Sequence, residues 1–364
     1  MKKIIASLYL FFVSFIVFSQ SNYSVGGKVI DAATKLPMQA ASVFAENTTI
    51  GTATAADGTF HLQLPNGGYE LVVTFTGYQT ETRRISSADA GNSDIVIEIK
   101  QKEKSLEDVV VKSTSEVADG LAKYGEFFLE NFIGKTANSK YCTIKNKEAL
   151  KFYYYRRANR LKILATAPLE IVNEALGYTI KYELDSFTHE YNTQVSQYTG
   201  SPLFEEMQTG KAEQKEKWNA ARLHAYNGSI LHFMRSLYNK KLSEEGFEIQ
   251  FLITVNEKEM AVPVKNFYGG LNYEKDDSTQ LVIAWPNQKE MVVIYKNEEP
   301  EQSYLDVNPE QPKKFQLSVF SFVPQEYIII EQNGYYFEQK DFTVNQYLAW
   351  EKVADMLPYN FSVK

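Results

Sequence analysis

The chain has 364 residues, a single cysteine and a formal net charge of −7. One cysteine excludes an internal disulfide, and an acidic chain is poorly suited to binding a phosphate backbone, which needs clustered Lys and Arg. The 24 tyrosines and 23 phenylalanines favour packed, β-rich domains over disorder. We therefore expect a globular protein with no nucleic-acid partner.

The first residues have the pattern of a secretory signal peptide. Lys2 and Lys3 precede an apolar run over residues 4–18, and Ser19 is a small residue suited to cleavage. The run is shorter than the roughly 20 residues of a membrane-spanning helix, with an uncleaved anchor as the alternative. We predict that residues 1–19 are removed, which lowers the net charge from −7 to −9. The protein is then exported, to the periplasm or to a peripheral association with the outer membrane.

Residues 22–100 contain short predicted strands separated by turns. Asp57-Gly58 is a hairpin signal, because Gly tolerates positive φ and Asp bonds its local backbone. The strands at 59–64 and 95–99 partly alternate apolar and polar residues. Several strands at regular spacing predict a β-sandwich of the seven-strand type. The predicted strands are 26–30, 41–45, 51–54, 59–64, 70–75 and 95–99.

Short motifs in this region resemble a known family. Residues 26–31 read GGKVID, residues 57–60 read DGTF, and residues 72–78 read VVTFTGY. Their order resembles that of the carboxypeptidase regulatory-like domain. The resemblance implies a transthyretin-like β-sandwich without catalytic activity, found at the N-terminus of exported Bacteroidetes proteins. It implies nothing about the activity of the rest of the chain.

Residues 101–118 have the composition of a linker, with a final strand predicted over 108–112. Residues 119–364 then predict one larger α+β domain, so the fold class is mainly β with an α+β C-terminal part. Apolar residues at helical spacing predict a helix over 119–133 and one long helix over 208–244. Residues 297–314, rich in Glu, Gln and Pro, predict a loop. The predicted strands are 150–155, 160–166, 178–184, 190–198, 248–254, 281–285, 290–295, 315–320 and 327–330.

The C-terminal part carries no recognised catalytic motif. A catalytic zinc needs three protein ligands, yet none of the four histidines begins a His-x-x-Glu pair. No Gly-x-Ser-x-Gly elbow occurs, and Cys142 lies between apolar neighbours that favour burial. We therefore predict no metal, no cofactor and no enzymatic activity. Residues 167–173, 176–184, 226–229 and 232–237 resemble uncharacterised segments that follow this module in other Bacteroidetes proteins, and that resemblance implies no activity.

Two polar groups are candidate ligand sites. His224, Asn227, His232 and Arg235 lie on the predicted long helix, where residues three or four apart face one another. They could bind an anionic or carbohydrate ligand, although we favour the alternative that they fix how the helix docks. Tyr154 and Arg156 form a second group, which could stack on sugars or peptides if its strand is exposed. Here too we favour a structural role.

These observations predict an exported, non-catalytic envelope protein. It would act as an adaptor or binding module for an envelope protein, a glycan or another envelope component. The alternative is a periplasmic hydrolase or a glycan-binding protein with its site in the C-terminal part. A deep pocket with convergent polar groups and perturbed acids or bases would favour the enzyme, whereas an exposed apolar or aromatic patch would favour a binding module.

Overall fold

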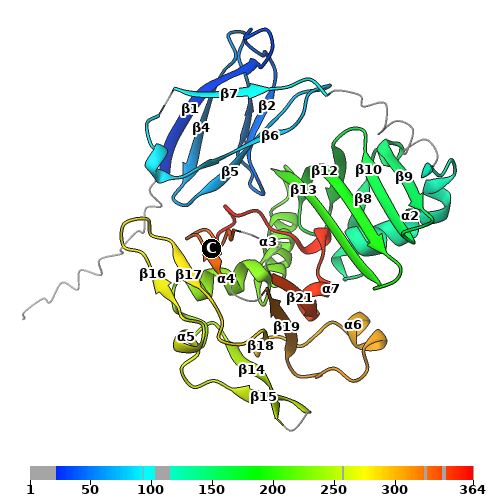
Figure 1. Ribbon diagram of the computed structural model, residues 1–364, viewed down its shortest axis with the longest axis vertical. Coiled ribbons are helices and arrows are strands. Elements are labelled where there is room, and N and C mark those ends of the chain that lie inside the picture. The colour runs from blue at the N-terminus through cyan, green and yellow to red at the C-terminus, as the bar shows by residue number, and fades with distance from the viewer. Residues whose placement is uncertain are drawn as a thin grey trace, which may run out of the picture.

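The computed structural model describes residues 22–92, 94–102, 115–255, 258–323, 326–337 and 342–363. The predicted signal peptide and the predicted strand over 108–112 lie outside these ranges. The described chain is mainly β, with an N-terminal sandwich at the top of Figure 1 and a larger α+β part below and to its right. The predicted fold class is confirmed.

The N-terminal part is a β-sandwich of seven described strands. One sheet has the order β4-β1-β7 and the other the order β3-β2-β5-β6. Alternating side chains of β4 and β7 point into a core shared by both sheets. All six predicted strands are present, whereas β6 was missed because its charged residues show no alternation. The strands are β1 (Asn22–Asp31), β2 (Ser42–Ala45), β3 (Gly51–Ala53), β4 (Thr59–Pro65), β5 (Tyr69–Thr74), β6 (Glu81–Ile85) and β7 (Ile95–Ile99).

The next part is a six-stranded antiparallel sheet that packs against one helix. Its path is β8-β11-β12-β10-β9, and β13 pairs with β12. Helix α2 (Gly120–Phe132) lies where the apolar spacing predicts it and buries Phe128 and Phe132 against the sheet. The strands are β8 (Cys142–Ile144), β9 (Leu150–Tyr155), β10 (Arg160–Ala165), β11 (Leu169–Asn173), β12 (Tyr178–Glu190) and β13 (Val195–Glu206).

The remaining residues build a second core around two further sheets, with the orders β15-β14-β18-β19-β21 and β16-β17-β20. Helix α4 contributes Phe233, Met234 and Leu237 to this core. The strands are β14 (Phe247–Val255), β15 (Lys258–Pro263), β16 (Glu274–Lys275), β17 (Val282–Ala284), β18 (Glu290–Tyr295), β19 (Gln316–Phe322), β20 (Ile328–Ile330) and β21 (Phe342–Gln346). The helices are α3 (Ala212–Tyr226), α4 (Ile230–Tyr238), α5 (Phe267–Gly270), α6 (Gln302–Val307) and α7 (Tyr347–Trp350).

The single long helix predicted over 208–244 is wrong. The chain forms α3 and α4 instead, with a break at Asn227 and Gly228. Gly228 has a φ of 76°, which a residue with a side chain rarely adopts, and Ser229 then caps α4 by accepting a hydrogen bond from the His232 amide. Periodicity missed this break because apolar residues continue at helical spacing on both sides of it.

Other boundaries also differ. Strand β12 runs on to Glu190 and returns through a tight turn as β13, so the predicted strand over 190–198 spans two strands. The predicted loop over 297–314 contains helix α6. Among the described residues, no helix is both long and apolar enough to cross a membrane.

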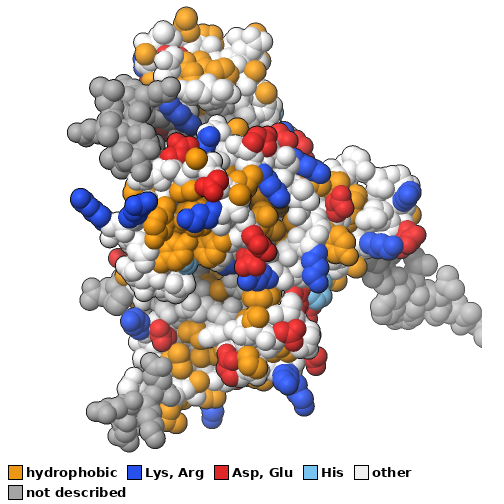
Figure 2. All heavy atoms as spheres, turned by 90° about the vertical axis from the view of Figure 1, so that its right-hand side faces the viewer, with side chains coloured by type: hydrophobic (Ala, Val, Ile, Leu, Met, Phe, Trp, Pro, Cys, Tyr) orange, Lys and Arg blue, Asp and Glu red, His pale blue; other side chains and the backbone are white. Residues whose placement is uncertain are grey.

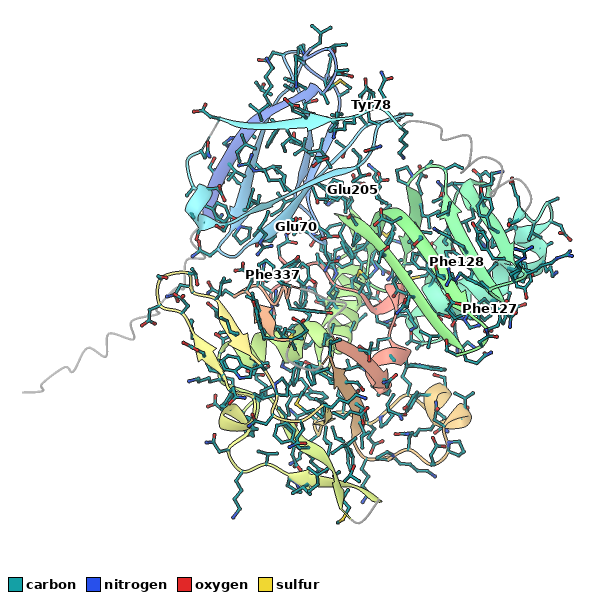
Figure 3. The ribbon with its side chains drawn as sticks, viewed as in Figure 1. Glu70, Tyr78, Phe127, Phe128, Glu205 and Phe337 are labelled. Carbon is teal, nitrogen blue, oxygen red and sulfur yellow. The ribbon has the colours of Figure 1, made fainter. Side chains whose placement is uncertain are left out.

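The sandwich is bonded directly to the rest of the chain. The Asn47 amide donates to the Pro202 carbonyl at 2.8 Å, and the Phe204 amide donates to the Thr48 carbonyl at 2.8 Å. On β6, Arg84 pairs with Glu331, and its guanidinium lies 4.3 Å from the centre of the Phe337 ring. Figure 3 shows Glu70 of β5 and Phe337 on the two sides of this contact, with Glu205 on nearby β13.

Figure 2 shows the face at the right of Figure 1. Hydrophobic side chains gather in its middle, and charged side chains of both signs are scattered around them. Part of the aromatic content of the six-stranded sheet lies near the surface, because Tyr124, Phe127 and Tyr191 are only partly buried where they pack against its core. The scattered charges of both signs on the face in Figure 2 are typical of a solvated protein surface.

Candidate functional site

The predicted helix cluster centres on the turn between α3 and α4, where His232 is buried. Its Nδ1 accepts a hydrogen bond from the Gly228 amide at 3.1 Å, so Nε2 carries the proton and faces a carboxylate oxygen of Glu245 at 3.3 Å. Burial lowers the pKa of His232, and the bond to Glu245 opposes that shift. Both ring nitrogens therefore have partners within the protein.

Of the other predicted helix residues, Arg235 and Asn227 bond to neighbouring segments, and His224 lies apart from them on the surface. Arg235 donates from Nε to the Asn333 carbonyl and from Nη2 to the Tyr359 carbonyl, each at 2.9 Å. Asn227 donates to a carboxylate oxygen of Glu298 at 3.0 Å. His224 is exposed on α3. The described contacts hold the helix pair in place, as the structural alternative for this cluster requires.

Tyr154 and Arg156 are not brought to the helix cluster. The Tyr154 hydroxyl donates to Oδ1 of Asn159 at 2.6 Å, and its ring packs at 6.4 Å from Tyr124 and 6.0 Å from Tyr191. Arg156 is exposed in the turn after β9. The six predicted site residues thus fall into two separate groups.

A more telling feature is a cavity of about 620 Å³ where the three parts of the chain meet. We call it the junction cavity. The sandwich contributes Glu46 and Asn47, the β12–β13 hairpin contributes Tyr182 and Asp185, and the last described segment closes it. In Figure 1 this last segment runs between the sandwich and the helices α3 and α4. That segment supplies Glu351, Lys352, Asp355 and Tyr359.

Local backbone features position the cavity acids. The register of β12 against β13 shifts between Leu184 and Ser186, which leaves Asp185 as the extra residue of a β-bulge. Bulges re-aim a side chain out of the normal alternation, and this one brings Asp185 to the cavity rim. Glu46 follows directly after β2, where the φ of 52° at Asn47 turns the chain toward β13.

Burial changes the ionisation of these groups. It raises the pKa of Glu46 to about 7, with repulsion from Glu70 and Asp185 adding to the shift. It raises the pKa of Asp355 to about 6 and that of Glu351 well above its ordinary value, where Asp355 repels it further. Burial lowers the pKa of the neighbouring Lys352. Perturbed acids in a cavity are a recognised sign of a functional site.

Asp355 differs from the other acids because it is tied to the protein. Its carboxylate accepts bonds from the Thr136 hydroxyl at 2.9 Å and from the Asn138 amide nitrogen at 2.9 Å. These bonds fasten the closing segment to the region after α2. Glu351, by contrast, has no hydrogen-bond or ion-pair partner among the described residues, although protein surrounds it.

Tyrosines form much of the cavity wall. Tyr182 is only 3% exposed, and beside it in the wall Asn47 Oδ1 is buried without a hydrogen-bond partner among the described residues. Burial raises the pKa of Tyr182 well above its ordinary value, and repulsion from Tyr198, Glu46 and Asp185 adds to the shift. Tyr335 already carries a cation on its ring, with the Arg84 guanidinium 4.5 Å from the ring centre.

The sequence alone pointed to none of these cavity residues. Glu46, Asp185 and Glu351 are far apart in sequence and belong to no motif, and adjacent acids elsewhere in the chain are a stronger local signal. The segment 351–355, which reads EKVAD, offers one faint signal, since it places two acids and a lysine among apolar residues. Its meaning depends on the cavity that folding creates.

Two further observations concern metal binding and the single cysteine, which lies outside the cavity lining. Within the described ranges, no three His, Cys, Asp or Glu side chains are placed to hold a metal ion. Burial, with repulsion by Asp355, raises the pKa of Cys142 to about 12, so its thiol is a poor nucleophile at neutral pH.

Comparison with known proteins identifies the N-terminal part. Residues 25–111 match the family model described as the CarboxypepD_reg-like domain. The predicted resemblance is confirmed. This domain is a regulatory-like, non-catalytic module. It accounts for less than half of the chain, so it does not assign the α+β part. No curated protein matches the chain.

Solved structures show only weak overall likeness. A pilus 2b backbone protein of group B streptococcus is 20% identical, covers 22% of this chain and 41% of its own, and has a TM-score of 0.19. A DUF3823 family protein from Bacteroides ovatus is 13% identical, with 52% and 83% coverage and a TM-score of 0.18. Another from Parabacteroides merdae is 11% identical, with 51% and 80% coverage and a TM-score of 0.18. This chain thus spans less than two thirds of the pilus protein.

Proposed function

We propose that this protein is an exported, non-catalytic binding protein of the cell envelope, and that the junction cavity is its ligand site. The observation that carries this proposal is the cavity itself. Its volume of about 620 Å³ lies within the range of about 300–1,000 Å³ that is common for small-molecule sites. It also gathers perturbed acids and tyrosines from three parts of the chain.

In this proposal, the N-terminal domain supplies part of the ligand site. Glu46 and Asn47 form part of the cavity wall, and the Tyr359 amide donates to the Asn47 carbonyl at 2.6 Å. The CarboxypepD_reg-like domain would therefore complete a ligand site in the α+β part. An adaptor role is compatible with this arrangement, because a ligand in the cavity would touch all three parts at once.

A hydrolase is the second candidate, and the raised pKa of the cavity acids favours it. A carboxylic acid that holds its proton near pH 7 can act as a general acid, as Glu46 could. Glycoside hydrolysis needs one protonated carboxylic acid and one ionised carboxylate flanking the same bond. The hydrogen bonds of Asp355 to Thr136 and Asn138 give that acid a structural role, which weakens this candidate.

A blocking substitution tests the proposed site. Thr199 lies at the cavity rim on β13 and is exposed, so Thr199→Trp should fill the entrance without disturbing a core. Gln197→Trp on the same strand is the matched control, because Gln197 is exposed and lies outside the cavity. The mature chain would be screened by saturation-transfer NMR against fragments with equal numbers of cationic, neutral and anionic members.

We expect fragments that bind the wild-type chain and Gln197→Trp but not Thr199→Trp. The proposal fails if no fragment binds, or if both variants retain the same set. Turnover of a bound glycoside or peptide fragment by the wild-type chain, lost in Glu46→Gln, would instead support the hydrolase.

A further inference from the structure

We infer that the junction cavity binds an organic cation, and that its best ligand carries two ammonium groups joined by a short aliphatic chain. This inference rests on the proposed function and names the class of ligand. It is carried by the charges of the cavity wall, by their distribution and by the tyrosines between them.

The cavity wall has an excess of acids. Glu46, Asp185, Glu351 and Asp355 line it, and Lys352 is the one cationic residue of its described lining. Two cations act from outside. Arg84 is committed to Glu331 and to the Tyr335 ring, and Lys102 lies near Asp185. The described lining thus carries four acids and one cation, an imbalance that favours a ligand with positive charge.

The acids fall into two pairs on different walls. Glu46 and Asp185 are close enough for Asp185 to repel Glu46, and they come from the sandwich and the β12 bulge. Glu351 and Asp355 form the second pair, and both come from the closing segment. Two separate acid pairs match a ligand with a charge at each end better than a ligand with a single charge.

A bare metal ion does not fit this distribution. A metal ion draws its ligands to one point, and the described residues hold no cluster of three His, Cys, Asp or Glu side chains suited to that. An ammonium group is different, because it offers three donors and also interacts with aromatic faces. Acids spaced around a cavity can each receive such a group.

Tyrosine side chains between the acid pairs offer hydrogen-bond acceptors to the ammonium groups and ring surface to the aliphatic chain. Tyr182 is 3% exposed and lines the cavity, and Asn47 Oδ1 in the same wall is buried without a partner among the described residues, so each offers an oxygen that can accept a hydrogen bond from an ammonium group. Tyr198, Tyr335 and Tyr359 offer ring surface to an aliphatic chain. The stacking of Arg84 on Tyr335 shows that one of these rings already holds a cation.

A panel of five-carbon probes tests the inference. Cadaverine has two ammonium groups, pentylamine has one, pentanediol is neutral and glutarate has two carboxylates, while the chain length stays the same. Each would be titrated into the mature wild-type chain by NMR and calorimetry at pH 8. We expect cadaverine to bind about tenfold more tightly than pentylamine, with no measurable binding of pentanediol or glutarate.

Variants separate cavity binding from attraction to an acidic surface. Glu351→Gln and Glu46→Gln each remove one carboxyl group from the cavity and should weaken cadaverine binding about tenfold. Glu205→Gln is the matched control, because Glu205 is an exposed acid on β13 outside the cavity. It should leave the affinity unchanged, and circular dichroism would confirm that each variant is folded.

The outcomes distinguish the inference from the proposed function. Binding of pentanediol or glutarate as tight as that of cadaverine, and lost in Thr199→Trp, would overturn the cation class and leave the cavity as a ligand site. Failure of every five-carbon probe to bind, or equal weakening of cadaverine by Glu205→Gln, would also overturn the inference. The fragment screen with Thr199→Trp decides the proposed function independently.

One further probe separates two sources of the same chemistry. At about pH 6.5, where its α-amino group is largely protonated, lysinamide carries two ammonium groups at the same carbon spacing as cadaverine, together with an amide, and both would be titrated at that pH. Tighter binding of lysinamide would identify an amino-terminal lysine of a peptide as the natural form. Tighter binding of cadaverine would identify a free diamine, and weaker binding of both than of pentylamine would refute the requirement for two charges.

Discussion

The turn between α3 and α4 and the junction cavity are neighbours with opposite polar character. At the turn, His232, Arg235 and Asn227 all have hydrogen-bond partners inside the protein. In the cavity wall, Asn47 Oδ1 is buried and has none among the described residues. A buried polar group without a partner costs free energy, whereas a fully bonded one stabilises the fold.

The difference shows how to read polar residues in this chain. The cluster with the clearer sequence pattern is satisfied by the protein, so its residues hold the structure together. The cavity acids show no sequence pattern, yet they retain hydrogen-bonding capacity for a ligand. The following predictions test this division, beginning with the largest expected effect.

Arg235→Ala should destabilise the fold most. The substitution leaves the Asn333 and Tyr359 carbonyls without their donor and loosens the segment that closes the cavity. We expect a loss of about 2–4 kcal/mol in the free energy of unfolding, measured with urea. At low temperature, the molecules that remain folded should keep Glu46 and Glu351 in the cavity wall. A variant as stable as the wild type would contradict the role of Arg235 in holding the closing segment.

The stability of the ligand-free protein should fall as the pH rises from 5 to 8. Glu46, with a pKa of about 7, and Asp355, with a pKa of about 6, hold protons longer in the folded state than in the unfolded state. Their contribution is complete below the unfolded values near 4 and is lost as the pH rises through the folded values.

We expect a decrease of about 2 kcal/mol across this range, measured by urea unfolding at several pH values. The buried His232 and His189, whose pKa values are lowered, act in the opposite direction below pH 6.5. Glu46→Gln should therefore flatten the profile relative to the wild type. An unchanged profile in this variant would contradict the assignment of the effect to Glu46.

Glu351→Gln should stabilise the ligand-free protein at pH 8. The substitution removes a buried carboxylate that Asp355 repels and keeps its shape. We expect a gain of about 1 kcal/mol together with the weaker cadaverine binding described above. A gain in stability together with a loss of binding is the trade-off expected at a functional site. A loss of stability at pH 8 would instead give Glu351 a structural role.

His224→Ala and Arg156→Ala should have the smallest effects. Both side chains are exposed, and neither lines the junction cavity. We expect urea midpoints and cadaverine affinities that equal those of the wild type within error. Weakened cadaverine binding in either variant would mean that the substituted residue takes part in ligand binding. It would contradict the division between a structural turn and a ligand-binding cavity.

Several elements could be predicted because their signals are local. The β-sandwich strands and helix α2 follow from alternation, turn residues and helical spacing within short windows. Strand β6 was missed because its Glu, Thr and Arg residues show no alternation, and its position is set by pairing with β5. The break at Gly228 was missed because a positive φ leaves no trace in hydrophobic periodicity.

The sequence by itself determined the class of the N-terminal domain, the β-rich character of the chain and the absence of a recognised catalytic motif. Only the tertiary structure decided which polar residues are free. Hydrogen-bond satisfaction depends on partners such as Asn333 and Tyr359, which lie about 100 residues or more from Arg235 along the chain. A cavity that joins Glu46 to Glu351 is likewise made by folding, because it exists only where distant walls fail to fill the space between them.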